Sequence, residues 1–373
     1  MKSNKISLSI ILTVLAGCVE DGDRMNLVRL VRGGEYDGSG SNNSQNKEIQ
    51  LSNIVGSLSA DQANSMYNGG TDVHSNDVNN NSSTTLYSYN GNDKQYYPKY
   101  LQFSDSGDGV VATTQMDYYD YDSFITSPTS LTSTNISKNR DGSINIVLQD
   151  ENKQKKLNVL LGANQLKDFN KIGSYLDYGI WQYNDGLPIY AVLYGSGQLG
   201  VINNDNQRTD IALKDGKRSV EFTGKTNAVK KSNNNVTNLT GDVTIEFKAN
   251  SLSNNNYGSE LQSNVKLKYT GWKTIDFEQY ADSNGIYNVK VDDESISING
   301  NMNMQFNQSE SHEAGIGNEG NNVNVNVYDR VVGVYNLENI PENDGTVEII
   351  GGFAAKAKDE NNYFAITPNT YNY

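Results

Sequence analysis

Few residues in this chain have the type and spacing that catalysis or metal binding requires. The chain has two histidines, His74 and His312, and one cysteine, Cys18. The histidines are far apart in sequence and stand in polar surroundings, so they do not form the close ligand pair of a zinc site. Each is either a haem ligand or a solvated loop residue. Neither lies in a motif with a serine and a carboxylate, and we expect no enzyme activity, no metal site and no cofactor.

One glycine-rich segment matches a nucleotide-binding motif in its letters only. Gly315 to Gly320 reads GIGNEG, which fits G-x-G-x-x-G. A dinucleotide site needs a strand before this motif and a helix after it, so that the pyrophosphate meets the helix N-terminus. Here the polar NQSESHEA precedes the motif and the strand-like NVNVNVY follows it. We interpret the segment as a loop between strands.

A cluster of tyrosines and aspartates has the strongest binding character. Met116 to Asp122 reads MDYYDYD. Tyrosine gives a large amphipathic contact area at low entropic cost, and the interleaved aspartates suit a basic partner. In a strand, Tyr119 and Tyr121 share one face and Tyr118 lies on the other. These three tyrosines are the predicted ligand-binding residues; the alternative is that they are half-buried strand aromatics.

The N-terminus has the pattern of a lipoprotein signal peptide. Residues 1–18 read MKSNKISLSIILTVLAGC, in which two lysines precede an apolar run that is too short to span a bilayer. The small residues before Cys18 resemble the bacterial lipobox, in which the cysteine becomes the lipidated first residue. An ordinary signal peptide with an incidental cysteine is the alternative. As the only cysteine, Cys18 can form no intrachain disulfide, and stable anchoring needs more than one acyl chain.

Composition narrows the class of partner. The net charge is −14, which argues against nucleic acid and against a polybasic grip on a membrane. No later stretch is apolar for long enough to span a bilayer. Val19 follows the cysteine in place of the aspartate that retains such lipoproteins in the inner membrane, so we expect the outer membrane.

The first part of the mature chain predicts a tether and a β-rich domain. Residues 19–57 are the predicted flexible tether, with a polar stretch rich in glycine, serine and asparagine from Gly33 to Lys47. Ser59, with Gln62 three residues on, forms a capping-box pattern and predicts one short helix. Across 58–185, short strand-like runs are separated by turn signals such as Asp141-Gly142. This region is the predicted first domain.

Residues 186–373 show cleaner strand alternation. Apolar residues alternate with polar ones in GDVTIEFKA and NVKLKYTGW, where the expected core residues are Val243, Ile245, Phe247, Val265, Leu267 and Tyr269. Such alternation predicts an antiparallel sheet with one face on a core. Many such strands with hardly any helix predict a sandwich or closed barrel, and closure also removes aggregation-prone edges. A membrane barrel would need a continuous apolar outer band, whereas the outer face here carries Lys, Glu, Asn and Thr. We therefore expect a soluble barrel.

The C-terminal segment predicts the end of that sheet. Thr346 to Thr367 contains two apolar runs around a polar DENN turn, which predicts a terminal hairpin. The pair Gly351-Gly352 predicts a bulge or bend where the sheet curls.

The C-terminal half resembles a family of surface lipoproteins. VEFTGKTNAV, GDVTIEFKANSLS and the strands within Val331–Ala357 are similar to the surface lipoproteins of Gram-negative bacteria typified by transferrin-binding protein B and factor H-binding protein. The chain departs from the family where NLENIPENDG replaces a glycine-rich and acidic alanine stretch. The resemblance implies an all-β fold, with an N-terminal handle-like domain (58–185) before an eight-stranded antiparallel barrel (186–373). It also implies export by an outer-membrane translocator of the surface lipoprotein assembly modulator type. It carries over no ligand-binding residue.

These observations lead to one functional expectation and two alternatives. We expect a lipid-anchored outer-membrane protein that faces outward and binds a host macromolecule, such as transferrin, a haem protein or a host defence factor. The first alternative is a colonisation or adhesion lipoprotein of a symbiont. The second is a structural envelope lipoprotein that faces the periplasm.

Overall fold

The computed structural model describes most of the C-terminal nine-tenths of the chain. The described residues are 49–56, 58–68, 85–88, 94–98, 101–106, 109–120, 125–126, 129–163, 175–184, 186, 189–196, 199–201, 210–213, 219–232, 235–249, 261–279, 287–296, 300–314, 323–343, 345–358 and 364–367. The chain divides into two compact units, Met1–Ser44 and Gln45–Tyr373, and all described residues belong to the second.

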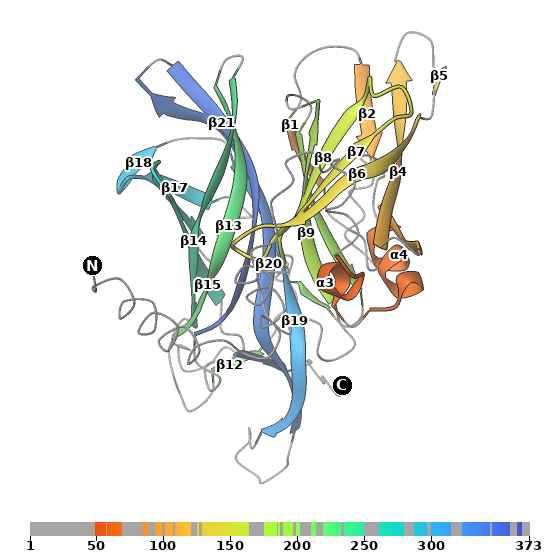
Figure 1. Ribbon diagram of the computed structural model, residues 1–373. Helices are drawn as coiled ribbons and strands as arrows, with labels where there is room; N and C mark the ends of the chain where they lie inside the picture. The colour runs from red at the N-terminus through yellow and green to blue at the C-terminus, as the bar shows by residue number, and fades with distance from the viewer. Residues whose placement is uncertain are drawn as a thin grey trace, which may run out of the picture. The chain divides into compact units, whose positions relative to one another are not determined.

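The described residues are nearly all in β-strands, which confirms the predicted class (Figure 1). The described helices are α3 (Ser52–Val55) and α4 (Ala60–Asn68), and neither has the length and apolar character needed to cross a bilayer. The predicted capping box begins α4. The Ser59 N–H donates to Gln62 Oε1 at 3.0 Å, and the Gln62 N–H donates to Ser59 Oγ at 3.3 Å.

The first sheet is antiparallel and has the order β1-β10-β9-β8-β7-β6-β4-β2, with β3 and β5 paired to β4. Its strands are β1 (Thr85–Ser88), β2 (Lys94–Pro98), β3 (Gln102–Ser106), β4 (Gly109–Asp120), β5 (Ile125–Thr126), β6 (Thr129–Lys138), β7 (Ile144–Gln149), β8 (Lys156–Leu161), β9 (Tyr175–Tyr183) and β10 (Ile189–Ser196). The predicted boundary between residues 185 and 186 lies between β9 and β10, which pair with each other in this sheet.

Helix α4 covers one face of the first sheet and closes its core. Tyr67 packs edge-on against Phe103 and Tyr194, with ring centroids 5.5 and 4.8 Å away. Asn64 fixes the helix to β3, because its Nδ2 donates to the Phe103 carbonyl and its Oδ1 accepts from the Phe103 N–H. The alternating residues of β7 and β8, such as Ile146 and Val159, are buried beneath.

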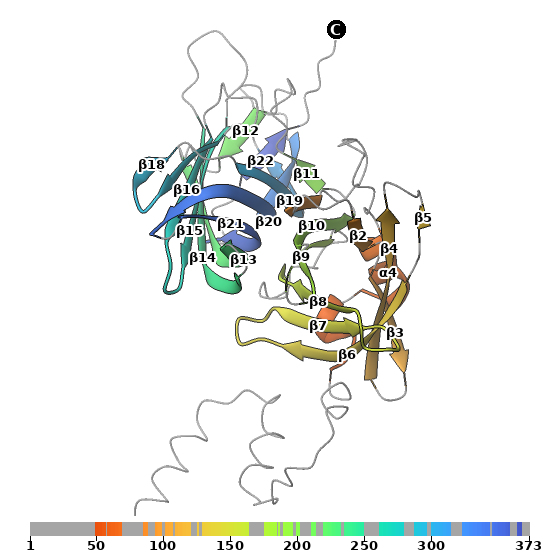
Figure 2. The same cartoon turned by 90° about the horizontal axis from the view of Figure 1, so that it is seen from above.

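The second sheet is antiparallel and curls into a half-barrel (Figure 2). Its order is β11-β19-β20-β21-β13-β14-β15-β16-β17-β18, and β22 pairs with β12 and β20. Its strands are β11 (Leu199–Val201), β12 (Asp210–Leu213), β13 (Ser219–Ser232), β14 (Asn235–Ala249), β15 (Leu261–Tyr269), β16 (Thr274–Gln279), β17 (Tyr287–Val291), β18 (Glu294–Ile296), β19 (Gly300–Ala314), β20 (Val323–Glu342), β21 (Gly345–Ala357) and β22 (Phe364–Thr367).

The interior of the half-barrel holds the predicted alternating core. Val243, Ile245 and Phe247 of β14 are buried there. Val265 and Leu267 of β15 are buried beside them, as predicted. At β21 the pattern changes, because the run from Ile349 to Ala355 is buried on both faces of the strand. One face points into the half-barrel and the other meets the first sheet.

The two sheets meet through an apolar layer built from both. The second sheet contributes Val229, Val332, Val334, Ile350 and Ala354, and the first contributes Ala163, Leu176, Tyr178, Ile180, Ile189, Ala191 and Leu193. Tyr178 of β9 lies at the centre of this layer. A Cβ atom added at Gly162 or at Gly352 would collide with the Tyr178 ring. Both glycines therefore leave the space that the ring fills.

The predictions for the C-terminal segment are partly wrong. The strand Phe364–Thr367 pairs with β12 and β20, while β21 pairs with β13 and β20, so these strands form no hairpin with each other. Gly351 and Gly352 form no bulge, since their register with both neighbouring strands is continuous. Their lack of side chains serves packing: Gly351 makes room for Tyr335, and Gly352 makes room for Tyr178.

We predict that Gly352→Ala destabilises the protein by about 1–3 kcal/mol, because the added methyl group overpacks the layer at Tyr178. Urea unfolding measures the change. Gly186→Ala is the matched control, since a Cβ there would meet its nearest neighbour at 3.8 Å; it should stay within about 0.5 kcal/mol of the parent. Equal stability of the two variants would contradict this account of the sheet contact.

Candidate functional site

A cleft of about 660 Å³ lies between the two sheets. Strands β6 to β9 of the first sheet form one wall, and β13 and β14 of the second form the other. The turn between β6 and β7 adds Asn139, Arg140 and Asp141. Side-chain amides dominate the polar lining, from Asn135, Asn145, Asn158, Gln182, Asn227 and Asn238.

The amides of the first wall form a row across four strands. Asn135 lies opposite Val147, Val147 opposite Asn158, and Asn158 opposite Gln182. Residues in such a row point to the same face of a sheet. The Oδ1 atom of Asn135 is buried and has no hydrogen-bond partner among the described residues. An unsatisfied buried acceptor of this kind is rare in proteins.

A β-bulge turns Asn135 toward the cleft. Leu131 and Ile136 of β6 are both buried in the core of the first sheet, although they are five positions apart. In a regular strand, residues an odd number apart face opposite sides. The register shift between Ser133 and Asn135 inserts Thr134 as an extra residue, so the alternation reverses at that point. Asn135 thereby leaves the core side and lines the cleft.

A hydrogen-bonded chain joins the opposite wall to the β6–β7 turn. The Tyr178 hydroxyl donates to Asn227 Oδ1 at 2.7 Å, and Asn227 Nδ2 donates to Asp141 Oδ2 at 3.1 Å. Asp141 Oδ1 also accepts from the Ser143 N–H and hydroxyl. Partial burial favours a raised pKa for Asp141, but the hydrogen bonds from Ser143 and Asn227 outweigh it and hold the pKa below its ordinary value. The carboxylate is therefore charged at neutral pH.

Two further asparagines fix the shape of this turn. Asn145 Nδ2 donates to Asn139 Oδ1 at 2.9 Å, and Asn139 Nδ2 donates to Ser143 Oγ at 2.8 Å. These bonds hold the rim in place beside the amide row. The floor between the walls is apolar, and it includes Leu160, Ile180 and Val229. The site thus combines an apolar floor with fixed polar walls.

A second polar group is buried beneath α4, on the other side of the first sheet. Asp177 accepts hydrogen bonds from the Tyr67 hydroxyl at 2.5 Å and from the Ala163 and Tyr178 N–H groups at 2.8 and 2.7 Å. Burial raises the pKa of Asp177 to about 6, against the lowering effect of these bonds. Asp177 is fully buried, is not among the residues that line the cleft, and bonds to Tyr67 of α4, so we assign it to the attachment of this helix.

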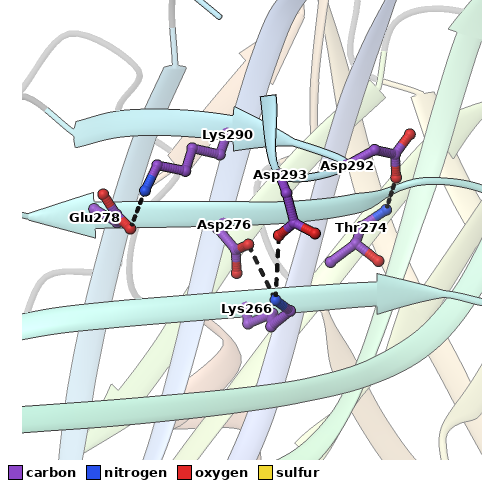
Figure 3. A network of polar contacts seen from close by, with 7 residues as sticks. All are labelled: Lys266, Thr274, Asp276, Glu278, Lys290, Asp292 and Asp293. Atoms are coloured by element: carbon purple, nitrogen blue, oxygen red, sulfur yellow. Dashed lines mark hydrogen bonds and ion pairs between the residues drawn. The ribbon is translucent and has the colours of Figure 1, made fainter. Parts of the chain in front are cut away.

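A network of charges covers the outer face of β15 to β17 (Figure 3). Lys266 pairs with Asp276 at 3.2 Å and with Asp293 at 3.9 Å, and Lys290 pairs with Glu278 at 2.7 Å. The network follows the strand register, which sets Asp276 between Lys266 and Lys290. Asp276 is buried at the centre of this network, whereas the side chains of Lys266 and Asp293 are 47% and 90% exposed. Pairs with an exposed partner contribute little each, and we interpret this face as the outer wall of the half-barrel.

Two of the three predicted ligand-binding tyrosines lie in a described strand. Tyr118 and Tyr119 are in β4, opposite Tyr96 and Gln95 of β2, so this part of the segment is a strand as predicted. Tyr121 lies outside the described residues, as do Cys18 and His74. The cleft begins at β6, and β4 is the next strand along this sheet. Their role in binding stays a prediction.

The loop interpretation of His312 is wrong. His312 is in β19, opposite Val325 of β20. Gly315 to Gly320 lies outside the described residues, between β19 and β20, so the element that follows this motif is a strand. Among the described residues, no group of three or more His, Cys, Asp or Glu is placed to hold a metal ion.

Sequence reasoning missed the amides of the cleft. Asn145 and Asn158 alternate with buried neighbours in SINIVLQ and LNVLLG, so the pattern places them on the polar face of their strands. A polar face is normally assigned to solvent. The sequence of the second sheet indicates that this face is covered. The apolar runs of β20 and β21 are unbroken, so both faces of these strands must pack against other residues.

We predict that Asp177 lowers stability as the pH rises. Between the ordinary carboxyl pKa, about 3.9, and about 6, the folded protein keeps a proton that the unfolded chain has lost. Stability therefore falls by about 3 kcal/mol across this window and stays lower above it. Asp177→Asn should remove this fall, as measured by urea unfolding at pH 4 and pH 7.5.

Asp141→Asn tests a carboxyl group whose pKa is shifted in the opposite direction from that of Asp177. Its lowered pKa stabilises the folded protein above the ordinary carboxyl pKa, and this contribution is lost as the pH falls. The substitution should therefore cost more stability at pH 7.5 than at acid pH. If Asp177→Asn changes stability equally at both pH values, the buried carboxyl does not titrate as described.

The interpretation of the cleft as a binding site rests on the residues that line it. The described lining of the cleft is made of amides, hydroxyls and aliphatic side chains with one arginine and one aspartate. Such a lining can bind and orient a polar ligand through hydrogen bonds. Comparison with protein-family models, with curated proteins and with solved structures finds no match for this chain.

Proposed function

We propose that this chain is a non-enzymatic, lipid-anchored surface protein of the outer membrane that binds a host macromolecule through the cleft between its sheets. The observation that carries the proposal is the cleft itself, whose two walls come from different sheets and carry hydrogen-bonding groups fixed on strands. Sites on regular strands are held more rigidly than sites on loops. Such a site suits recognition.

The membrane attachment rests on the N-terminal sequence. Cys18 would carry the acyl chains, and the polar segment after it would act as the tether. An outer-membrane translocator of the surface lipoprotein assembly modulator type would deliver the protein to the outer face. Haem or iron capture, evasion of host defence and adhesion are all compatible with this placement.

The family resemblance adds a finer proposal for the fold. We propose that the first sheet is the handle-like domain and that the second forms an eight-stranded barrel. The path from β19 through β20, β21, β13, β14, β15 and β16 to β17 passes through eight neighbouring strands. Its ends, β17 and β19, approach within 8 Å between Cα atoms. This proximity supports a barrel that closes at that seam.

Protease shaving of intact cells tests the surface placement. We expect the protein to be digested while the outer membrane is intact, with a periplasmic marker left whole as the control. Survival until the membrane is breached would favour the structural envelope lipoprotein and overturn the surface proposal.

A pull-down tests binding and separates the two candidate surfaces. The chain from Val19 onward should capture a host component from serum or tissue extract. If the tyrosine cluster contributes, Tyr119→Ala with Tyr121→Ala lowers capture at unchanged thermal stability. Lower stability with unchanged capture would mean that these are strand aromatics. Capture from tissue and not from serum would favour the colonisation alternative, and no capture from either would contradict the proposal.

A further inference from the structure

We propose that the inter-sheet cleft binds a neutral oligosaccharide, the glycan portion of the host molecule. This inference rests on the proposed binding function and names its ligand class. It follows from the chemistry of the cleft walls, from one unsatisfied acceptor, and from the strands that form the walls.

The walls match the hydrogen-bonding character of sugar hydroxyls. A hydroxyl group both donates and accepts, and a side-chain amide offers two donors and one acceptor oxygen. The row Asn135, Asn158 and Gln182 crosses four strands, which at about 4.8 Å per strand spacing spans roughly 14 Å. Asn238 presents an exposed amide from the opposite wall, where the Asn227 amide is already bonded to Tyr178 and Asp141. A chain of sugar rings carries hydroxyls at repeated intervals along such a length.

The side-chain oxygen of Asn135, on the first wall, is a hydrogen-bond acceptor without a donor among the described residues. The Oδ1 atom of Asn135 is buried without a hydrogen-bond partner in the described structure, and a bulge in β6 turns this residue to the cleft side. Leaving a buried acceptor unpaired costs stability. Bulges are enriched beside binding sites, where they re-aim a side chain. The oxygen is closed to a water-sized molecule, so a ligand hydroxyl donates to it once the Asn135 amide turns toward the cleft.

The charges and the floor favour a neutral, ring-shaped ligand. Arg140 and Asp141 both line the cleft, and Asp141 accepts hydrogen bonds from Ser143 and Asn227 that keep it ionised. Their opposite charges offset each other, and the net charge of −14 disfavours an anionic sugar. The apolar floor at Leu160, Ile180 and Val229 offers a surface for the C–H faces of sugar rings.

Most of the cleft wall offers side chains and not a free strand edge. A peptide that adds a strand needs an exposed sheet edge. Where they line the cleft, β7, β8, β9 and β13 pair on both sides, whereas in the described register the lining residues of β6 pair only with β7 and those of β14 only with β13. Along the four inner strands, recognition is therefore between side chains and ligand.

The test uses the chain from Val19 onward on an array of neutral and sialylated oligosaccharides, followed by calorimetric titration of the neutral compound that binds best. We expect neutral compounds to bind. Asn135→Ala should weaken binding at least tenfold without lowering the melting temperature, because it removes an unpaired acceptor. Asn238→Ala, an exposed position on the other wall, should also weaken it. Asn288→Ala, an exposed asparagine on β17 outside the cleft, should bind like the parent.

The outcomes separate this inference from the proposed function. If no oligosaccharide binds, or if binding is equal in Asn135→Ala, Asn238→Ala and Asn288→Ala, the glycan inference is wrong. If the host component is captured equally before and after enzymatic removal of its glycans, the glycan inference fails while the binding function holds. Preference for sialylated over neutral compounds would likewise overturn it.

Discussion

The contact between Tyr178 and two glycines is the constraint on which the rest of this structure depends. Gly162 lies beside Tyr178 in the first sheet, and Gly352 lies in the second. The ring can enter the layer between the sheets only because neither position has a side chain. Its hydroxyl then reaches Asn227, and through Asn227 the β6–β7 turn. One side chain therefore sets the approach of the sheets and also fixes one edge of the cleft that opens beside them.

The sequence predicts most of the elements because their signals are local. The capping box at Ser59 and Gln62 predicts the start of α4, and the alternation in GDVTIEFKA predicts which residues of β14 face the core. Pairing is less local. The strand Phe364–Thr367 follows β21 after a turn-like segment, yet it pairs with β20 and β12. Its partners are far away in sequence, and no pattern within the strand identifies them.

The site is harder to predict than the fold, because its residues become a site only when two sheets meet. Asn145 and Asn158 have the pattern of solvent-facing strand residues. The orientation of Asn135 is not predictable from the alternation of β6. The bulge at Thr134 reverses that alternation, which would otherwise place Asn135 in the core. The glycine pair illustrates the same limit. Gly351 and Gly352 suggest a bend when considered alone, whereas each accommodates a tyrosine from another strand.

The separation of Tyr178 and Gly352 along the chain has a consequence for how the protein is made. The first sheet is complete once β10 has been synthesised, whereas β21 ends at Ala357, close to the C-terminus. Contacts between residues so distant in sequence form late, because the intervening chain must be ordered first. During synthesis, the apolar face of the first sheet that packs against β21 therefore stays uncovered until almost the whole polypeptide has been made. A product that stops before β21 would display this face without its opposing partner.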